Sequence, residues 1–211
     1  MFIWDAKSGR YRDELTKKFV SRSVVLKHVE RQNGRSKNYM RQQAQKLVDR
    51  SISLGQFQAT MIEELKRSHI RMALLAAGGK NGVSEREYGV TGAKLREEYK
   101  YLNNFVRAIA RGELTPNRII YRAGLYANSS SATFYESEKI SRVRHKKDKI
   151  LVARRSLDAQ SHHCSDCPAY STNGEWRPVE EVVLPKRNCT CHSRCRCKIE
   201  YKYITLSDRL L

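Results

Sequence analysis

The segment SEREYGVTGAKLREEYKYLNNFVRAIA, residues 84–110, decides most of the predicted fold. Ser84, with Glu87 three residues later, is the capping-box pattern that starts an α-helix. Apolar side chains then recur every three or four positions, at Leu95, Tyr99, Leu102, Val106 and Ile109. This spacing places them on one side of a helix, so the segment predicts a long amphipathic helix that packs against similar helices.

Comparable patterns lie on both sides of this segment. Serine and threonine are preferred N-caps, and proline is tolerated in the first turn of a helix. The further helix starts predicted in this way are Ser21 or Ser23, Ser36, about Gly55, and Thr115 followed by Pro116. The helix from Gly55 is predicted to end at Gly78, and the last one to continue through NSSSATF, residues 128–134, its weakest part. Residues 21–144 are thus predicted to form a helical bundle.

The first residues and the last residues differ from this helical pattern. Residues 1–20 begin with the apolar MFIW and show no clear period, so we predict an extended N-terminal arm that docks on the bundle or on a neighbouring subunit. Near residue 145 the period changes, and KILVARRSL and CRCKIEYKYI both have strand character. We predict that they pair antiparallel in a small β-containing unit over residues 145–211. The fold class is therefore α+β.

All six cysteines lie in this C-terminal unit, in the order C-x-x-C and then C-x-C-x3-C-x-C. A C-x-x-C pair can hold one side of a tetrahedral ion, and a second pair must come from elsewhere in the fold. The start of the chain has no secretory pattern, so we expect reduced thiols and no disulfide framework. Soft thiolate ligands favour Zn²⁺, and a thiolate-rich site is typically closed and structural.

We predict four zinc ligands from the spacing: Cys164, Cys167, Cys191 and Cys195. Cys197 is the main rival, although its position on the apolar side of a predicted strand suggests a buried thiol. The residues that the sequence leaves open as replacements for one ligand are Cys189, Cys197, His163 and His192.

The charge of the chain indicates a polyanionic partner. The sequence has 41 Lys and Arg against 22 Asp and Glu, a net charge of +19. A surface of this kind attracts nucleic acid through its phosphates, without reading the sequence. The predicted contacts to double-stranded DNA lie in the basic run 142–155, at Arg142, Arg144, Lys146, Lys147, Lys149, Arg154 and Arg155.

Several classes of protein are disfavoured by the sequence. Its apolar runs are too short to cross a bilayer, and its basic runs do not face a wide apolar stripe, so no membrane partner is expected. Catalytic motifs such as H-E-x-x-H and G-x-S-x-G are missing from the sequence. The histidines of SHHC precede both cysteine pairs, whereas in an H-N-H nuclease they lie between them. We therefore predict that the protein is not an enzyme.

The C-terminal segment resembles a family of phage minor head, or head-morphogenesis, proteins related to the F protein of phage Mu. The similarity consists of the strand ILVARRSL, the pair Cys164 and Cys167, a loop with Pro185, and C-R-C at 195–197 before a last strand. Short phage and prophage proteins resemble the chain further upstream, in Y-R-D, K-F-V-S and YGVTGAKLREEYKYLNNF.

This resemblance implies a structural protein of the virion head, assembled in the host cytoplasm in several copies. Its implied partners are portal or capsid proteins, and its implied roles are head assembly and DNA packaging or ejection. The alternative from the residues alone is a free zinc-knuckle protein that binds nucleic acid in a regulatory or accessory role.

Overall fold

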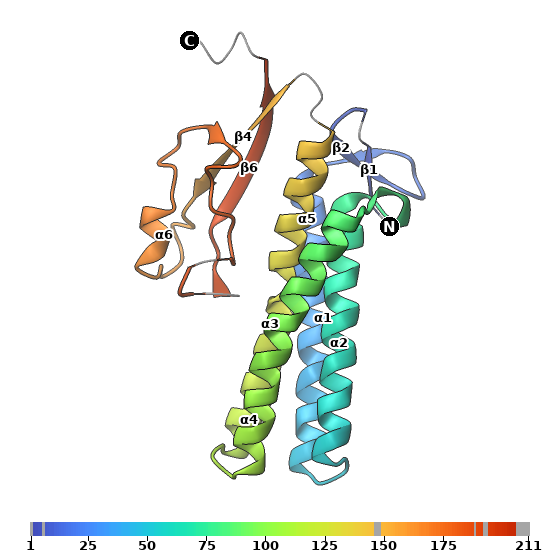
Figure 1. Ribbon diagram of the computed structural model, residues 1–211, viewed down its shortest axis with the longest axis vertical. Helices are drawn as coiled ribbons and strands as arrows, with labels where there is room; N and C mark the ends of the chain where they lie inside the picture. The colour runs from blue at the N-terminus through green and yellow to red at the C-terminus, as the bar shows by residue number, and fades with distance from the viewer. Residues whose placement is uncertain (1, 6, 146–148, 188, 192–193, 206–211) are drawn as a thin grey trace.

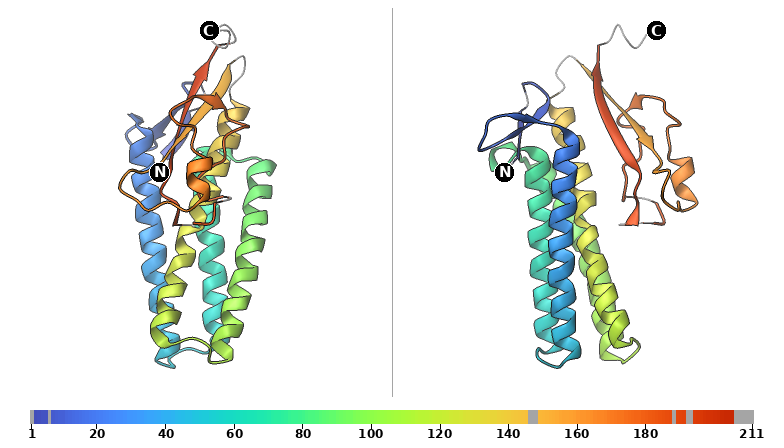
Figure 2. Two further views of the ribbon diagram at one scale, coloured as in Figure 1. Left: turned by 90° about the vertical axis from the view of Figure 1, so that its left-hand side faces the viewer. Right: turned by 180° about the vertical axis from the view of Figure 1, so that it is seen from behind.

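A computed structural model describes residues 2–5, 7–145, 149–187, 189–191 and 194–205. Long helices run up and down the molecule as an antiparallel bundle, and two small sheets lie towards one end of it (Figures 1 and 2). The predicted α+β class is confirmed. The elements are, in chain order, β1 (Phe2–Asp5), β2 (Arg10–Asp13), β3 (Phe19–Val20), α1 (Arg22–Val48), α2 (Leu54–Ala77), η1 (Lys80–Gly82), α3 (Glu85–Ala110), α4 (Pro116–Leu125), η2 (Tyr126–Asn128), α5 (Ser130–Arg144), β4 (Ile150–Ser156), α6 (Asp166–Ala169), β5 (Arg177–Pro178) and β6 (Lys198–Ile204).

Helix α1 is one continuous helix where the sequence predicts two. Its N-cap is Ser21, whose side chain accepts a hydrogen bond from the backbone N–H of Val24. Ser36, the predicted second cap, is buried in the middle of α1, so that prediction is wrong. The Ser36 hydroxyl donates to Glu64 Oε1 on α2 at 2.6 Å. A partner on the neighbouring helix thus occupies the side chain that would otherwise compete with the backbone.

The other helix boundaries largely follow the sequence signals. Helix α2 ends at Gly78, which has φ +84° in the left-handed region, and the capping box of Ser84 with Glu87 starts α3. Thr115 caps α4, with Pro116 in the first turn. The predicted fifth helix is interrupted by the 3₁₀ turn η2 and resumes as α5.

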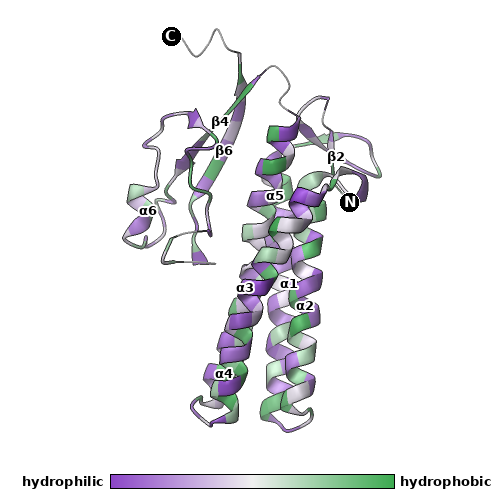
Figure 3. Ribbon diagram, in the orientation of Figure 1, coloured by the Kyte–Doolittle hydropathy of each residue, from purple (hydrophilic) through white to green (hydrophobic). Residues whose placement is uncertain are grey.

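The bundle has an apolar core at one end and a polar layer near its middle. Leu102 and Val106 of the opening segment are buried, and Leu95, Tyr99 and Ile109 pack beside them. Each long helix carries both hydrophobic and hydrophilic residues along its length (Figure 3). Among the described residues, none of the helices combines the length and the apolar character needed to span a bilayer.

The NSSSATF segment supplies the polar layer. Asn33 of α1 donates to Ser131 Oγ at 2.6 Å and accepts from Ser130 Oγ at 3.0 Å. His69 of α2 lies between Thr133 Oγ1, 2.7 Å away, and Ser129 Oγ, 3.1 Å away. Burial lowers the pKa of His69 to about 4, so its ring is neutral at pH 7.

The N-terminal residues form a three-stranded sheet, β1-β2-β3, and not an extended arm. Trp4 on β1 and Tyr11 on β2 are buried, with their rings edge to face at 5.0 Å. They pack on α1, α2 and α5 through side chains that include Val25, Met72 and Phe134. The antiparallel pairing satisfies backbone groups that an arm would leave to the solvent, and so lets the apolar start of the chain be buried.

The C-terminal sheet has the order β5-β4-β6. Strands β4 and β6 are antiparallel, in a register that runs from Ile150 opposite Ile204 to Ser156 opposite Lys198. The predicted pairing of these two strands is confirmed. All six cysteines therefore lie in the connection between β4 and β6.

Candidate metal centre

The connection between β4 and β6 is held against the sheet by its own core and by backbone contacts. Leu151 and Ile199 from the strands pack against Val179 and Leu184 from the connection, all of them buried. The N–H of Thr172 donates to the carbonyl oxygen of Arg155 at 3.0 Å, and this bond joins the middle of the connection to β4. The connection thus returns on itself, and its two cysteine-bearing stretches meet.

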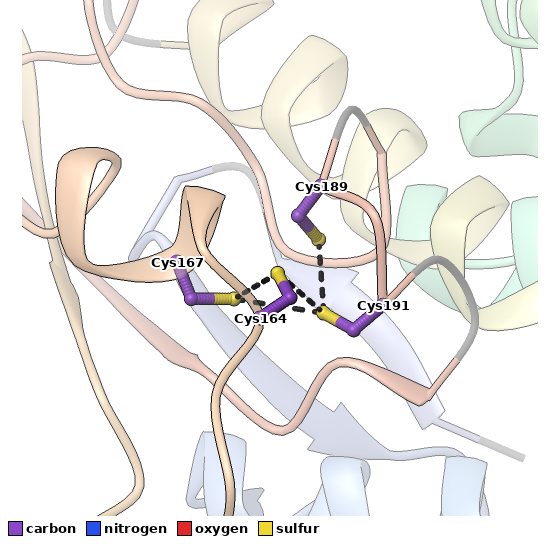
Figure 4. A group of neighbouring side chains, drawn as sticks. All are labelled: Cys164, Cys167, Cys189 and Cys191. Atoms are coloured by element: carbon purple, nitrogen blue, oxygen red, sulfur yellow. Dashed lines mark hydrogen bonds between the residues drawn. The ribbon is translucent and has the colours of Figure 1, made fainter.

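Four cysteine sulfurs converge at this meeting point. Cys164 and Cys167 come from the turn at α6, and Cys189 and Cys191 come from the loop before β6 (Figure 4). All four Sγ atoms lie within 4.8 Å of one another. Cys164 Sγ lies 3.4 Å from Cys167 Sγ and 3.4 Å from Cys191 Sγ, and Cys191 Sγ lies 3.3 Å from Cys189 Sγ. The N–H of Thr190 donates to Asp166 Oδ2 at 2.7 Å and so joins the two stretches.

Three of the four predicted ligands are brought together, and the fourth place differs from the prediction. Cys189 completes this group, whereas Cys195 Sγ lies 4.0 Å from Cys167 Sγ and outside the group. Cys189 and Cys191 form a C-x-C pair in one turn, so both side chains reach the same point. Cys195 lies at the end of that loop, where the chain enters β6. Of the open alternatives, His192 is outside the described residues.

A second group of possible ligands shares one member with the first. His163 Nδ1 or Nε2, Cys167 Sγ and Cys197 Sγ also lie within 4.8 Å of one another. The six cysteines and His163 can therefore hold a metal ion. All six cysteines are free thiols, as expected from the sequence.

Arg155 supplies positive charge to the cysteine cluster. Its side chain is fully buried, and Nη2 donates to Cys167 Sγ and to Cys195 Sγ, both at 3.6 Å. Nη1 donates to the carbonyl oxygen of Val183 at 3.0 Å. Burial alone would lower the pKa of Arg155, but its interactions with Cys197 and Cys195 raise it. A buried guanidinium beside thiols favours their anionic, metal-binding form.

The thiols differ in their pKa values even without an ion. Hydrogen bonding from Thr190 lowers the pKa of Cys164 to about 5. Burial alone would raise the pKa of Cys195, but backbone hydrogen bonds and the charge of Arg155 lower it to about 7. Burial raises the pKa of Cys167 and Cys191 well above the ordinary range. Bound metal would remove this penalty, because a coordinated thiol loses its proton.

The donor set fits zinc. Four sulfurs at zinc–sulfur distances of about 2.3 Å would form a tetrahedron with edges of about 3.8 Å. Four of the six sulfur pairs are separated by 3.3–3.5 Å, close to these edges, and the other two lie within 4.8 Å. Thiolates also select zinc over the hard cations, which prefer oxygen.

Two of the seven predicted DNA-binding residues are buried, so their assignment is wrong. Arg155 faces the thiols, and Arg142 is 7% exposed. Arg142 Nη2 lies 3.0 Å from Glu138 Oε1, and its guanidinium lies over the rings of Trp4 and Tyr201, 4.4 and 4.8 Å from their centroids. The sequence predicted that this run contacts DNA because clustered basic residues are usually exposed to solvent.

The other five predicted DNA-binding residues differ in whether they are paired, exposed or outside the described residues. Arg144 pairs with Glu87, Nη2 to Oε1 at 3.0 Å, and Arg154 pairs with Glu200. Lys149 is exposed. Lys146 and Lys147 lie outside the described residues.

The buried carboxylate of Glu138 and its partners connect the helical bundle, the N-terminal sheet and β6. Arg22 of α1 donates to both carboxylate oxygens of Glu138 at 2.7 Å, and Tyr11 of the N-terminal sheet donates to Oε1 at 3.3 Å. Arg22 Nη1 also donates to the carbonyl oxygen of Ile199 on β6 at 2.7 Å. Burial alone would raise the pKa of Glu138, but the charges of Arg22 and Arg142 lower it to about 2.

Sequence reasoning left Cys189 open as a replacement ligand without choosing it, assigned Arg155 to DNA instead of to the thiols, and missed Glu138. The C-x-C spacing with Cys191 was a usable signal for Cys189. For Arg155 and Glu138 the sequence held no such signal, because their partners are distant in sequence.

Comparison of the chain with models of known protein families, with curated proteins and with solved structures finds no match.

Proposed function

We propose that the protein is a structural component of a phage head, a minor head protein that associates with portal or capsid partners in several copies. In this proposal a zinc-bound knuckle holds the C-terminal unit together, while the helical bundle supplies contacts to other subunits. It lies against packaged DNA and has a part in head assembly and in DNA packaging or ejection.

The convergence of four cysteine sulfurs, with three of them supplied by the predicted pairs, carries the proposal. Two of the four thiols are buried, and the remaining two are only partly exposed. A four-thiolate zinc ion has no open position for a substrate, so this group supports a structural role. The ion would cross-link the α6 turn to the loop before β6. Two of these cysteines, Cys164 and Cys167, also belong to the pattern that resembles minor head proteins.

The charge of the chain supports the DNA contact. Arg154 and Lys202 flank the ring of Trp176, with their charged groups 4.8 and 5.1 Å from its centroid. Lys198 lies on the same face of β6 as Lys202 and is exposed, and Lys149 is exposed just before β4. This face therefore carries more basic than acidic side chains, although Glu200 pairs with Arg154. Such a face makes phosphate contacts that position a protein on DNA without reading its sequence.

Analysis of purified virions tests this function. A structural component copurifies with heads in a constant number of copies per particle, measured by quantitative mass spectrometry of gradient-purified heads. A free zinc-knuckle regulator of nucleic acid, the alternative, is abundant in the infected cell and depleted from washed virions. That second result would contradict the proposal.

The DNA contact makes a separate prediction. Replacing Lys146, Lys147 and Lys149 by glutamine should weaken binding to duplex DNA, because these side chains would no longer neutralise phosphates. The salt dependence should also flatten, by about one unit of slope for each phosphate that is left without its cation. Fluorescence anisotropy with DNA of unrelated sequences, between low and physiological salt, measures both quantities.

The matched control removes the same charge from the bundle. Lys46, Lys66 and Lys100 are exposed on α1, α2 and α3, and their replacement by glutamine keeps the net charge equal to that of the first variant. If both triple variants show the same fall in affinity and the same slope, the DNA contact is not localised to residues 146–149.

A further inference from the structure

We propose that the cysteine cluster holds two zinc ions, with the thiolate of Cys167 bridging them. This inference rests on the proposed metal centre and goes beyond it in the number of ions and in the ligands of the second. The first ion takes the group of four cysteines in Figure 4. The ligands of the second ion are Cys167, Cys197, His163 and, in the fourth position, Cys195.

A single ion leaves two adjacent thiols without a role. Cys195 and Cys197 are 2% and 3% exposed and belong to the same buried cluster as the four cysteines of the first site. A buried thiol on a strand is explained by packing alone when its neighbours are apolar. Leu157 and Tyr170 do pack against this cluster, but the thiols also lie beside further sulfurs, His163 and a buried guanidinium, which form the surroundings of a ligand.

Cys167 occupies the position of a bridge. It is the one residue that belongs to both groups of mutually close donor atoms found among the described residues. Its Sγ lies 3.4 Å from Cys164 Sγ and 3.5 Å from Cys191 Sγ in the first group, and 4.0 Å from Cys195 Sγ outside that group. These separations are close to the edge of about 3.8 Å expected for a zinc–thiolate tetrahedron. A thiolate has several lone pairs and can bind two ions at once.

Arg155 independently indicates negative charge on the second side. A fully buried guanidinium is unfavourable unless anions or acceptors surround it. Among the described residues no carboxylate forms an ion pair with Arg155, and its sulfur acceptors are Cys167 and Cys195. With one ion, Cys195 would not be coordinated, and the guanidinium would face a single metal-bound thiolate, that of Cys167. With two ions, both acceptors are metal-bound thiolates, and the guanidinium offsets part of the cluster's negative charge.

His163 distinguishes the second site from the first. It is a neighbour of Cys164 in sequence, yet its ring nitrogen groups with Cys167 and Cys197. Neutral imidazole is a common zinc ligand beside thiolates. The adjacent His162 is exposed and belongs to neither group, which makes it a matched control.

Metal counting on the full chain tests the proposal. The reduced protein is loaded with Zn²⁺, freed of loose metal, and examined by native mass spectrometry and elemental analysis. Two zinc ions per chain are expected. One ion per chain would overturn the two-ion inference and leave the proposed metal centre standing, whereas no bound zinc would overturn both.

Substitutions then assign the ligands. His163→Ala, which keeps all six cysteines, should retain one ion, and His162→Ala should retain two. Loss of the second ion should also remove one equivalent from a Co²⁺ titration followed by thiolate-to-cobalt absorption. If His163→Ala still binds two ions with unchanged cobalt spectra, the proposed second site is wrong.

Discussion

Replacing Glu138 by glutamine is expected to lower the free energy of unfolding by about 3–5 kcal/mol. Glutamine keeps the shape but removes the charge, so Arg22 and Arg142 remain as neighbouring cations with little access to solvent. Their mutual repulsion and desolvation are then no longer offset. Chemical denaturation followed by circular dichroism measures the loss.

The same carboxylate predicts a pH dependence. Its pKa in the folded protein is about 2, below the ordinary value of 4.5 that it regains on unfolding. The stabilisation, about 3 kcal/mol from this difference, is therefore fully present above pH 4.5 and is lost as the pH falls towards 2. The glutamine variant should lack this part of the acid dependence.

A surface carboxylate provides the control for Glu138. Glu97 pairs with Lys94 at 3.1 Å, and its side chain is 50% exposed. Exposed pairs of this kind contribute less than about 1 kcal/mol, so Glu97→Gln should change stability little. Equal and small losses in the two variants would contradict the role assigned to the buried pair.

Removing the metal is expected to unfold the C-terminal unit while the bundle remains folded. Zinc binding and folding are coupled in small thiolate sites, with apparent binding free energies of about 10 kcal/mol or more. A strong chelator, or Cys167→Ser, should abolish amide protection in β4, β6 and the connection between them. Hydrogen exchange with mass spectrometry resolves these segments from α2 and α3, which should stay protected.

The adjacent Ser165 serves as the control for Cys167. It is exposed at the start of the same turn, and Ser165→Ala leaves every donor of the cluster in place. Full protection of β4 and β6 in the metal-free protein would show that the buried side chains around Leu151 and Ile199 hold the unit without an ion. The bundle and the unit also share Arg22, so a modest loss of protection at the start of α1 is expected.

The cysteine centre was partly predictable from the sequence. Local spacing was sufficient for Cys164 and Cys167, because a short turn brings C-x-x-C thiols together whatever the rest of the fold does. The choice between Cys189 and Cys195 depended on how the loop before β6 turns, because that turn decides which of the two sulfurs approaches the others. Spacing alone carries no information on that turn.

The basic run shows the opposite limit. Its charges suggested a DNA surface, yet Arg142 and Arg155 are interior side chains whose partners are Glu138 and the thiols of Cys167 and Cys195. A buried charge is indistinguishable in sequence from an exposed one, because its compensation comes from residues brought near only by folding.

The sequence by itself determined the helical periods, most of the caps, the antiparallel pairing of the last strand with ILVARRSL, and the concentration of thiols in one unit. These depend on interactions within one turn of helix, or on the alternation of side chains along a strand. Tertiary structure alone decided that Ser36 lies inside a helix and that Arg22 links the bundle to β6. It also decided that the strands of Trp4 and Tyr11 pair in a folded sheet. Each of these outcomes depends on a partner far away in the chain, and only packing selects that partner.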